Sequence, residues 1–146
     1  MDGNISIAVV QNIAAKDKKS AINILLEKAM ELTQHGTKHP SRDVIYNDIM
    51  NRESLQSTGV GEEMAFPHLR VHERIEPVIV LGTSREGIDF HSPDKKPVHL
   101  IFFILSSVEN PYFILQSMSR IIKKAQKKEF RDLLLNTADA QAVAAM

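Results

Sequence analysis

Residues 97–105 read Pro-Val-His-Leu-Ile-Phe-Phe-Ile-Leu, a nearly continuous apolar run. Valine, leucine, isoleucine and phenylalanine in such a row are typical of a strand that is buried on both faces. A strand of this kind needs a covering layer on each side, and helices are the elements that provide such layers in α/β proteins. This stretch therefore predicts the centre of a sheet that is covered by helices.

Shorter strands are predicted around this central one. Ile5, Ile7 and Val9 recur at every second position, which is the spacing of one face of a strand. Further strands are predicted at residues 64–66, 77–83 and 88–90, the last two joined by a turn at residues 85–87.

Helices are predicted on either side of this strand-rich middle. Asp17 and Ser41 stand where a side chain caps the first turn of a helix, and Gly36 is a natural end for the first one. Each predicted helix carries apolar residues at the spacing of one buried face. These residues are Ile22, Leu25, Leu26, Ala29 and Leu32, then Val44, Ile45, Ile49 and Met50, then Phe113, Ile114, Met118 and Ile121, and finally Phe130, Leu133 and Leu134.

The element order predicts an α/β fold in one domain, residues 1–146, with a mixed sheet of about five strands flanked by helices. Residues 138–146 read as a helix that stops without a cap. We expect there either a short terminal helix or a chain cut from something longer.

Composition excludes several classes of protein. Eighteen basic residues balance eighteen acidic ones, so a nucleic-acid-binding protein driven by bulk charge is not expected. The chain has no cysteine, which excludes disulfide scaffolds and thiolate zinc sites. The apolar run at residues 97–108 is far shorter than the roughly 20 residues of a membrane helix. No export signal is visible at the N-terminus, so we expect a cytoplasmic protein without membrane insertion.

The segment with the most chemical potential is residues 52–68, Arg-Glu-Ser-Leu-Gln-Ser-Thr-Gly-Val-Gly-Glu-Glu-Met-Ala-Phe-Pro-His. Arg52 offers a planar fork for two oxygens of an anion, and Ser57 and Thr58 add hydroxyl donors. Gly59 and Gly61 allow backbone N–H groups to approach an anion closely. The segment is therefore a candidate phosphate site.

His68 follows a proline that fixes its own φ and ends a strand ladder. A neutral imidazole held there is accessible and nucleophilic, so His68 is a candidate phosphoryl acceptor. The alternative is structural: Pro67 and His68 end a strand, and the two glycines turn the chain. The spacing of the residues is compatible with both interpretations.

The combined string Arg52-Glu53-Ser54, Ser57-Thr58-Gly59-Val60-Gly61 and Ala65-Phe66-Pro67-His68 resembles the signature of the fructose/mannitol-type EIIA domains. These domains belong to the bacterial phosphoenolpyruvate-dependent sugar phosphotransferase system and include the nitrogen-regulatory EIIA proteins. The resemblance covers nearly the whole chain and implies the EIIA type-2 fold.

The resemblance implies a phosphotransferase component that works through a phosphohistidine. His68 would accept a phosphoryl group from the phosphocarrier HPr and pass it to an EIIB domain. Arg52 would lie beside the phosphohistidine, and Ser57, Thr58, Gly59 and Gly61 would line the phosphate pocket. No metal or other cofactor is needed, because the donor already carries an activated N–P bond.

The chain departs from the family pattern in two places. Ile114 stands where many members have a second histidine, and His91 and His99 are the candidates to replace it, although His99 fits a core residue better. Glu62 and Glu63 stand where the family usually has small or amide residues and a glycine, and carboxylates that face inward would repel a phosphate. Both departures favour a rival function: a regulatory module that binds a transporter or another regulator depending on its phosphorylation.

Two other signals have simpler interpretations. The pairs His35/His39 and His68/His72 have a four-residue spacing, but two ligands fall short of the usual zinc set, so no metal site is expected. A basic stripe near the C-terminus fits a solvated helix face, and docking to an acidic partner or to anionic lipid is the alternative. Its members are Arg120, Lys123, Lys124, Lys127, Lys128 and Arg131.

Overall fold

The structure is a computed structural model, described here for residues 5–33 and 41–136. Within these ranges the elements follow the order β1 (Ser6–Val10), α1 (Lys18–Leu32), α2 (Arg42–Leu55), β2 (Gly59–Gly61), β3 (Met64–Ala65), β4 (His68–Val71), β5 (Val78–Ile88), β6 (Val98–Ser107), α3 (Phe113–Lys124) and α4 (Lys128–Leu135). The predicted α/β class with a mixed sheet flanked by helices is confirmed. No helix among the described residues is long and apolar enough to span a bilayer.

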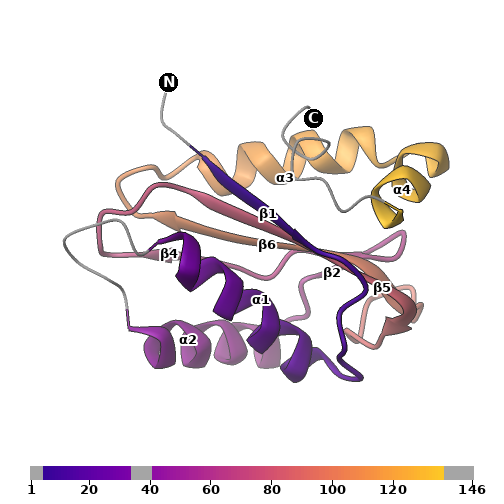
Figure 1. Cartoon of the computed structure of the whole chain (residues 1–146), viewed down its shortest axis with the longest axis horizontal. Coiled ribbons are helices and arrows are strands. Elements are labelled where there is room, and N and C mark those ends of the chain that lie inside the picture. The colour runs from indigo at the N-terminus through magenta and orange to yellow at the C-terminus, as the bar shows by residue number, and fades with distance from the viewer. Residues whose placement is uncertain (1–4, 34–40, 137–146) are drawn as a thin grey trace.

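The strands form one six-stranded sheet in the order β1-β5-β6-β3-β2, with β4 also paired to β6. β5 runs antiparallel to β6, whereas β1 is parallel to β5, and both β3 and β4 are parallel to β6. Helices α1 and α2 cover one face of the sheet, and α3 and α4 cover the other (Figure 1). The sheet is therefore the middle layer of three, as the apolar run at residues 97–105 predicted.

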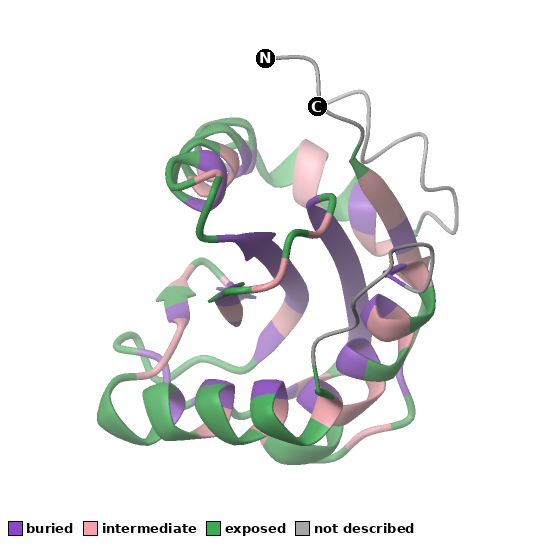
Figure 2. Ribbon diagram, turned by 90° about the vertical axis from the view of Figure 1, so that its left-hand side faces the viewer, coloured by how far each residue is buried: buried purple, intermediate pink, exposed green. Residues whose placement is uncertain are grey.

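The side chains of β6 alternate between the two cores. One set packs in the cluster with α1 and α2, and the other packs with α3 and α4. Along residues 100–105 the first set is Ile101, Phe103 and Leu105, and the second is Leu100, Phe102 and Ile104; Val98, at the start of the strand, also packs in the first cluster. Figure 2 shows the same division from the side, with the buried positions of the helices turned toward a buried sheet.

The predicted helix starts are confirmed by their caps. The Asp17 carboxylate accepts a hydrogen bond from the Ser20 N–H at 2.8 Å, and the Ser41 hydroxyl accepts one from the Val44 N–H at 3.5 Å. The hydrogen bonds from Ser20 favour the ionised carboxylate and lower the pKa of Asp17 below its ordinary value. Gly36 and residues 138–146 lie outside the described residues.

The structure corrects two strand boundaries. The turn predicted at residues 85–87 lies inside β5, where Thr83 pairs with Leu100 and Ile88 pairs with Val98, so β5 has three extra residues at this bulge. Gly87 takes a φ of +87° within it. The second correction concerns His68, which begins β4 instead of following the last strand of its segment. A third correction is β2, which forms at Gly59–Gly61 where a turn was predicted. β2 and β4 add two strands and the continuity of β5 removes one, so the sheet has six strands where about five were expected.

Phe102 offers a test of the core on the α3–α4 side. Its ring stacks on that of Phe66 with centroids 5.1 Å apart, and both residues are fully buried. We expect Phe102→Ala to lower the free energy of unfolding by about 3–5 kcal/mol, because it leaves a cavity beneath α3. Urea unfolding followed by circular dichroism measures this change. Leu115→Ala is the matched control: Leu115 is 68% exposed, and its replacement should change stability by less than about 0.5 kcal/mol.

Candidate functional site

An interruption between two short strands positions His68. β3 pairs with Leu100 and Ile101 of β6, and β4 pairs with residues 104–107 along the same edge. Phe66 and Pro67 span the gap, and the Pro67 carbonyl accepts a hydrogen bond from the Ile104 N–H at 3.0 Å. Because proline has no N–H, it cannot extend the ladder as a donor, and pairing resumes at His68.

The His68 ring is half-buried, and a hydrogen bond to the backbone selects the tautomer of its neutral form. Nδ1 lies 2.7 Å from the Phe66 carbonyl oxygen. A carbonyl oxygen can only accept a hydrogen bond, so Nδ1 carries the proton of the neutral ring. The lone pair of the neutral imidazole is therefore on Nε2.

His68 borders a cavity of about 310 Å³ between α2, the loop that follows it, and α3. Arg52 and Glu53 come from the last turn of α2, and Met118 comes from α3. Among the described residues that line the cavity, Arg52 and Glu53 are the two that carry a permanent charge. The remaining lining residues are Ile49, Gln56, Ser57, Thr58, Val60 and Phe66. The structure thus brings together Arg52, Ser57, Thr58 and His68 from the predicted set.

The donors of the loop are bonded to protein acceptors. The Ser57 hydroxyl donates to the Phe90 carbonyl and accepts from the Gly59 N–H at 3.0 Å. The Thr58 N–H lies 3.2 Å from both carboxylate oxygens of Glu53, and the Thr58 hydroxyl also donates to Glu53. The hydroxyl donors that we expected to point toward a phosphate, Ser57 and Thr58, are therefore engaged in hydrogen bonds that hold the loop.

Gly59 and Gly61 are the first and last residues of β2 and are not among the lining residues of the cavity, although Val60 between them is. A Cβ at Gly59 would come within 2.1 Å of the Ser92 hydroxyl oxygen, so any side chain there would collide with residue 92. Gly61 has a φ of +91°, which most residues avoid. The two glycines fix the path of the loop by close approach and by a turn.

Glu53 is the residue whose role the sequence interpretation missed. Its side chain is 2% exposed, and besides Thr58 it binds the Lys18 ammonium, with Nζ 2.9 Å from Oε2. Lys18 is 13% exposed and also lies over the Phe90 ring, 5.4 Å from the centroid. A glutamate directly after Arg52 on the buried side of α2 was the available signal, but nothing local pointed to Lys18, 35 residues earlier.

The two departures from the family pattern lie outside the cavity. Ile114 is buried in the apolar cluster beneath α3, and neither His91 nor His99 is among the lining residues. His99 instead binds the Ser84 carbonyl through Nδ1 at 2.7 Å and the Glu63 carboxylate through Nε2 at 3.2 Å. The Glu62 carboxylate faces Arg131 at 3.8 Å. Both carboxylates therefore lie beside residues outside the His68 cavity.

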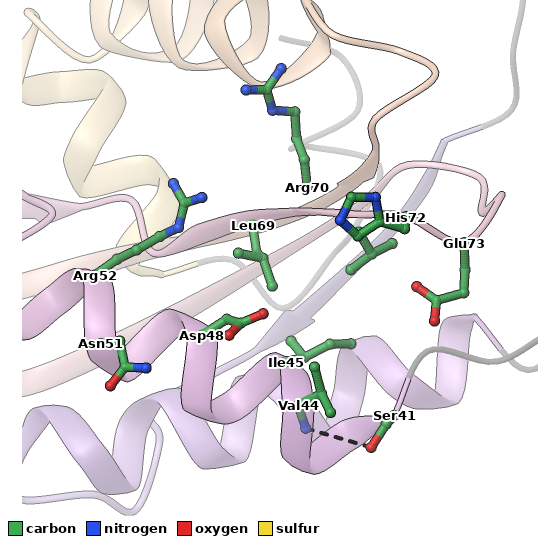
Figure 3. A pocket seen from close by; sticks show the side chains of 11 residues that line it. Ser41, Val44, Ile45, Asp48, Asn51, Arg52, Leu69, Arg70, His72 and Glu73 are labelled. Atoms are coloured by element: carbon green, nitrogen blue, oxygen red, sulfur yellow. Dashed lines mark hydrogen bonds between the residues drawn. The ribbon is translucent and has the colours of Figure 1, made fainter.

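A second hollow lies next to the first, between α2 and β4. This groove has a volume of about 450 Å³, and Arg52 lines both it and the His68 cavity. Figure 3 shows Leu69 of β4 and Ile45 of α2 in the groove, Asp48 and Arg52 on the helix, and His72 and Glu73 just after the end of β4. Arg52 thus lies on the rim between two hollows.

The remaining signals occupy other surfaces. No group of three or more possible metal-ligating side chains is found among residues 5–33 and 41–136, and His35 and His39 lie outside these ranges. A shallow hollow near the end of α3 is lined by Arg120, Lys123, Lys124, Lys127 and Phe130. The lysines of the basic stripe and Arg120 are exposed, as expected of a solvated helix face, whereas the Arg131 side chain is 14% exposed and donates to the Ala125 carbonyl.

Comparisons with known proteins agree with this architecture. The family model described as "Phosphoenolpyruvate-dependent sugar phosphotransferase system, EIIA 2" matches residues 6–146. The chain is 33% identical over 135 residues to the fructose-specific EIIABC component of Bacillus subtilis, covering 90% of this chain but 20% of that protein. It is 30% identical over 126 residues to the fructose-specific EIIA component of Haloferax volcanii, covering 86% of this chain and 79% of that protein. A nitrogen regulatory protein of Bradyrhizobium diazoefficiens is 28% identical over 137 residues, covering 93% and 86%.

Solved structures show the same fold. Nitrogen regulatory protein IIA-Ntr from Neisseria meningitidis matches with a TM-score of 0.72 and 26% identity, covering 97% of this chain and 90% of that one. Enzyme IIAMTL of Escherichia coli, in complex with phosphorylated enzyme IIBMTL, matches with a TM-score of 0.71 and 17% identity, covering 93% and 90%. The family model, the relatives and the fold agree, and the chain belongs to the EIIA type-2 family of the phosphoenolpyruvate-dependent sugar phosphotransferase system.

Proposed function

We propose that this protein is a phosphocarrier that accepts a phosphoryl group on Nε2 of His68. The observation that carries this proposal is the hydrogen bond between Nδ1 and the Phe66 carbonyl, which leaves the lone pair on Nε2 of a ring that borders a cavity. An imidazole nitrogen with a free lone pair is a competent nucleophile toward phosphorus at neutral pH.

The transfer balances without a proton leaving the ring. The Nε2 lone pair forms the new N–P bond while the N–P bond of the donor phosphohistidine breaks, and the donor imidazole keeps the electron pair of that bond. The His68 ring gains positive charge in this step, and the Phe66 carbonyl stabilises the ring through its Nδ1–H. Because the reaction exchanges one N–P bond for another, catalysis consists mainly of positioning and charge stabilisation.

Arg52 supplies the cation for the phosphoryl oxygens. It lines the same cavity as His68, and no carboxylate of the described residues forms an ion pair with it. Its guanidinium can hold two oxygens at once. Ser57 and Thr58 line the same cavity, and Gly59 and Gly61 set the path of the chain that carries them.

The proposed partners are an HPr-type donor and an EIIB acceptor, and the proposed location is the cytoplasm, where the protein would meet both. Support for the acceptor comes from the fold shared with enzyme IIAMTL, which was solved with phosphorylated enzyme IIBMTL. A second candidate function is regulatory: the phosphorylated and unphosphorylated forms would bind a transporter or regulator differently. The similarity to nitrogen regulatory proteins and to IIA-Ntr favours this candidate.

Phosphorylation of His68 is directly testable. Incubation with phosphoenolpyruvate, enzyme I and HPr should add one acid-labile phosphoryl group to the wild-type protein, detected by intact mass spectrometry. His68→Ala should abolish the addition, because no other described histidine lines the cavity. NMR of the labelled ring should place phosphorus on Nε2, because Nδ1 is held as a donor to the Phe66 carbonyl.

His91→Ala is the control for that experiment, since His91 is exposed and lies outside the cavity. It should label like the wild type. A folded wild-type protein that takes no label from phosphorylated HPr would refute the transfer function. Labelled protein that passes nothing to EIIB would instead favour the regulatory function.

Arg52 should affect the rate of labelling. We expect Arg52→Ala to slow single-turnover transfer from phosphorylated HPr by about 10- to 100-fold, because charge-assisted hydrogen bonds contribute about 1.5–3 kcal/mol. Arg52→Lys keeps the charge but loses the fork, and should lie between Ala and wild type. Arg74→Ala is the control, because Arg74 is 85% exposed and pairs with Glu109 away from the site. Equal rates for Arg52→Ala and the wild type would remove Arg52 from the mechanism.

A further inference from the structure

The wall of the His68 cavity contains a buried negative charge close to the place where a phosphoryl group would bind. Glu53 lines the cavity with His68 and Arg52, and its side chain is 2% exposed. An uncompensated carboxylate there would oppose the phosphoryl charge and cancel the attraction of Arg52. At short range and in a low-dielectric environment, such a charge is only weakly screened.

Lys18 compensates that charge. Its ammonium lies 2.9 Å from the Glu53 carboxylate, and the side chain is 13% exposed. The rest of the Glu53 acceptor capacity is used by the Thr58 N–H and hydroxyl. With Glu53 and Lys18 paired, Arg52 remains as the unpaired cation among the described lining residues.

We propose that Lys18 is a positioning residue of the phosphoryl site: through Glu53 it neutralises the cavity wall, so that the charge of Arg52 acts on the phosphoryl group. This inference rests on the proposed phosphorylation of His68. It assigns a function to a residue at the start of α1, far in sequence from the segment at residues 52–68. The pair also fixes the loop, because the same carboxylate holds Thr58.

A charge role of the Lys18–Glu53 pair and a purely structural role predict different effects of the single variants on phosphorylation of His68. Lys18→Met leaves the Glu53 charge uncompensated, so it should disfavour phosphorylated His68. Glu53→Gln keeps an acceptor for Thr58 but adds a net positive charge, so it should favour phosphorylated His68. The double variant Lys18→Met/Glu53→Gln has a neutral pair and should return to the wild-type value. If the pair served only to hold the loop in place, both single variants would instead have a lower equilibrium constant for phosphorylation.

The measurement is the equilibrium between phosphorylated protein and a fixed mixture of HPr and phosphorylated HPr, read by intact mass spectrometry. We expect the equilibrium constant to fall about tenfold in Lys18→Met, to rise in Glu53→Gln, and to lie within about threefold of wild type in the double variant. Lys19→Met is the matched control: Lys19 is the exposed neighbour of Lys18 and should change nothing. Thermal unfolding by circular dichroism checks that each variant is folded.

Each outcome is decisive. A fall in both single variants, or the absence of recovery in the double variant, would overturn the charge role. If Lys18→Met does not fold, Glu53→Gln is compared with the double variant. Equal equilibrium constants for phosphorylation in these two variants would also overturn the charge role of Lys18. A wild-type protein that takes no label would refute the proposed function itself, which distinguishes the two failures.

Discussion

Strand β6 is the constraint on which the site depends. It is buried on both faces, and its two edges are shared between β5 on one side and β3 followed by β4 on the other. β3 and β4 do not join into one strand, because Pro67 lies between them and cannot donate to the ladder. The interruption turns the Phe66 ring onto Phe102 and its carbonyl toward His68. A packing contact and a hydrogen bond of Phe66 thus position the His68 ring.

The architecture was predictable from local patterns, and the details of pairing were not. The apolar run at residues 97–105 and the caps at Asp17 and Ser41 are local signals, and each gave the correct element. The start of β4 at His68 and the continuity of β5 through Gly87 depend on β6 as a partner. Turn-forming residues mark a change of direction or a bulge equally well, and only the neighbouring strand decides between them.

In the candidate site, too, the residues were predictable from a local pattern and their bonding partners were not. The segment at residues 52–68 brought Arg52, Ser57, Thr58 and His68 to one cavity because they lie within 17 residues on a helix end, a loop and a strand. The hydrogen-bond partners of these residues come from elsewhere. Phe90 holds Ser57, and Lys18 reaches Glu53 from α1. No local pattern announces a contact between side chains that are 35 residues apart, so the compensation of Glu53 could not be read from the sequence.

The charges around His68 explain how the chain accommodates its departures from the family pattern. The Glu62 carboxylate faces Arg131 and the Glu63 carboxylate lies beside His99, so both point to residues outside the cavity. Ile114 puts an apolar side chain where the resemblance implied a second imidazole, and Met118 of the same helix lines the cavity instead. An apolar wall contributes no hydrogen bond to a phosphoryl group. It does lower the local dielectric constant, which strengthens the electrostatic interactions between the remaining charges. Under the proposed phosphorylation of His68, the permanent charges of the cavity wall that act on the phosphoryl group are those of Arg52 and Glu53, and Lys18 compensates the second of them.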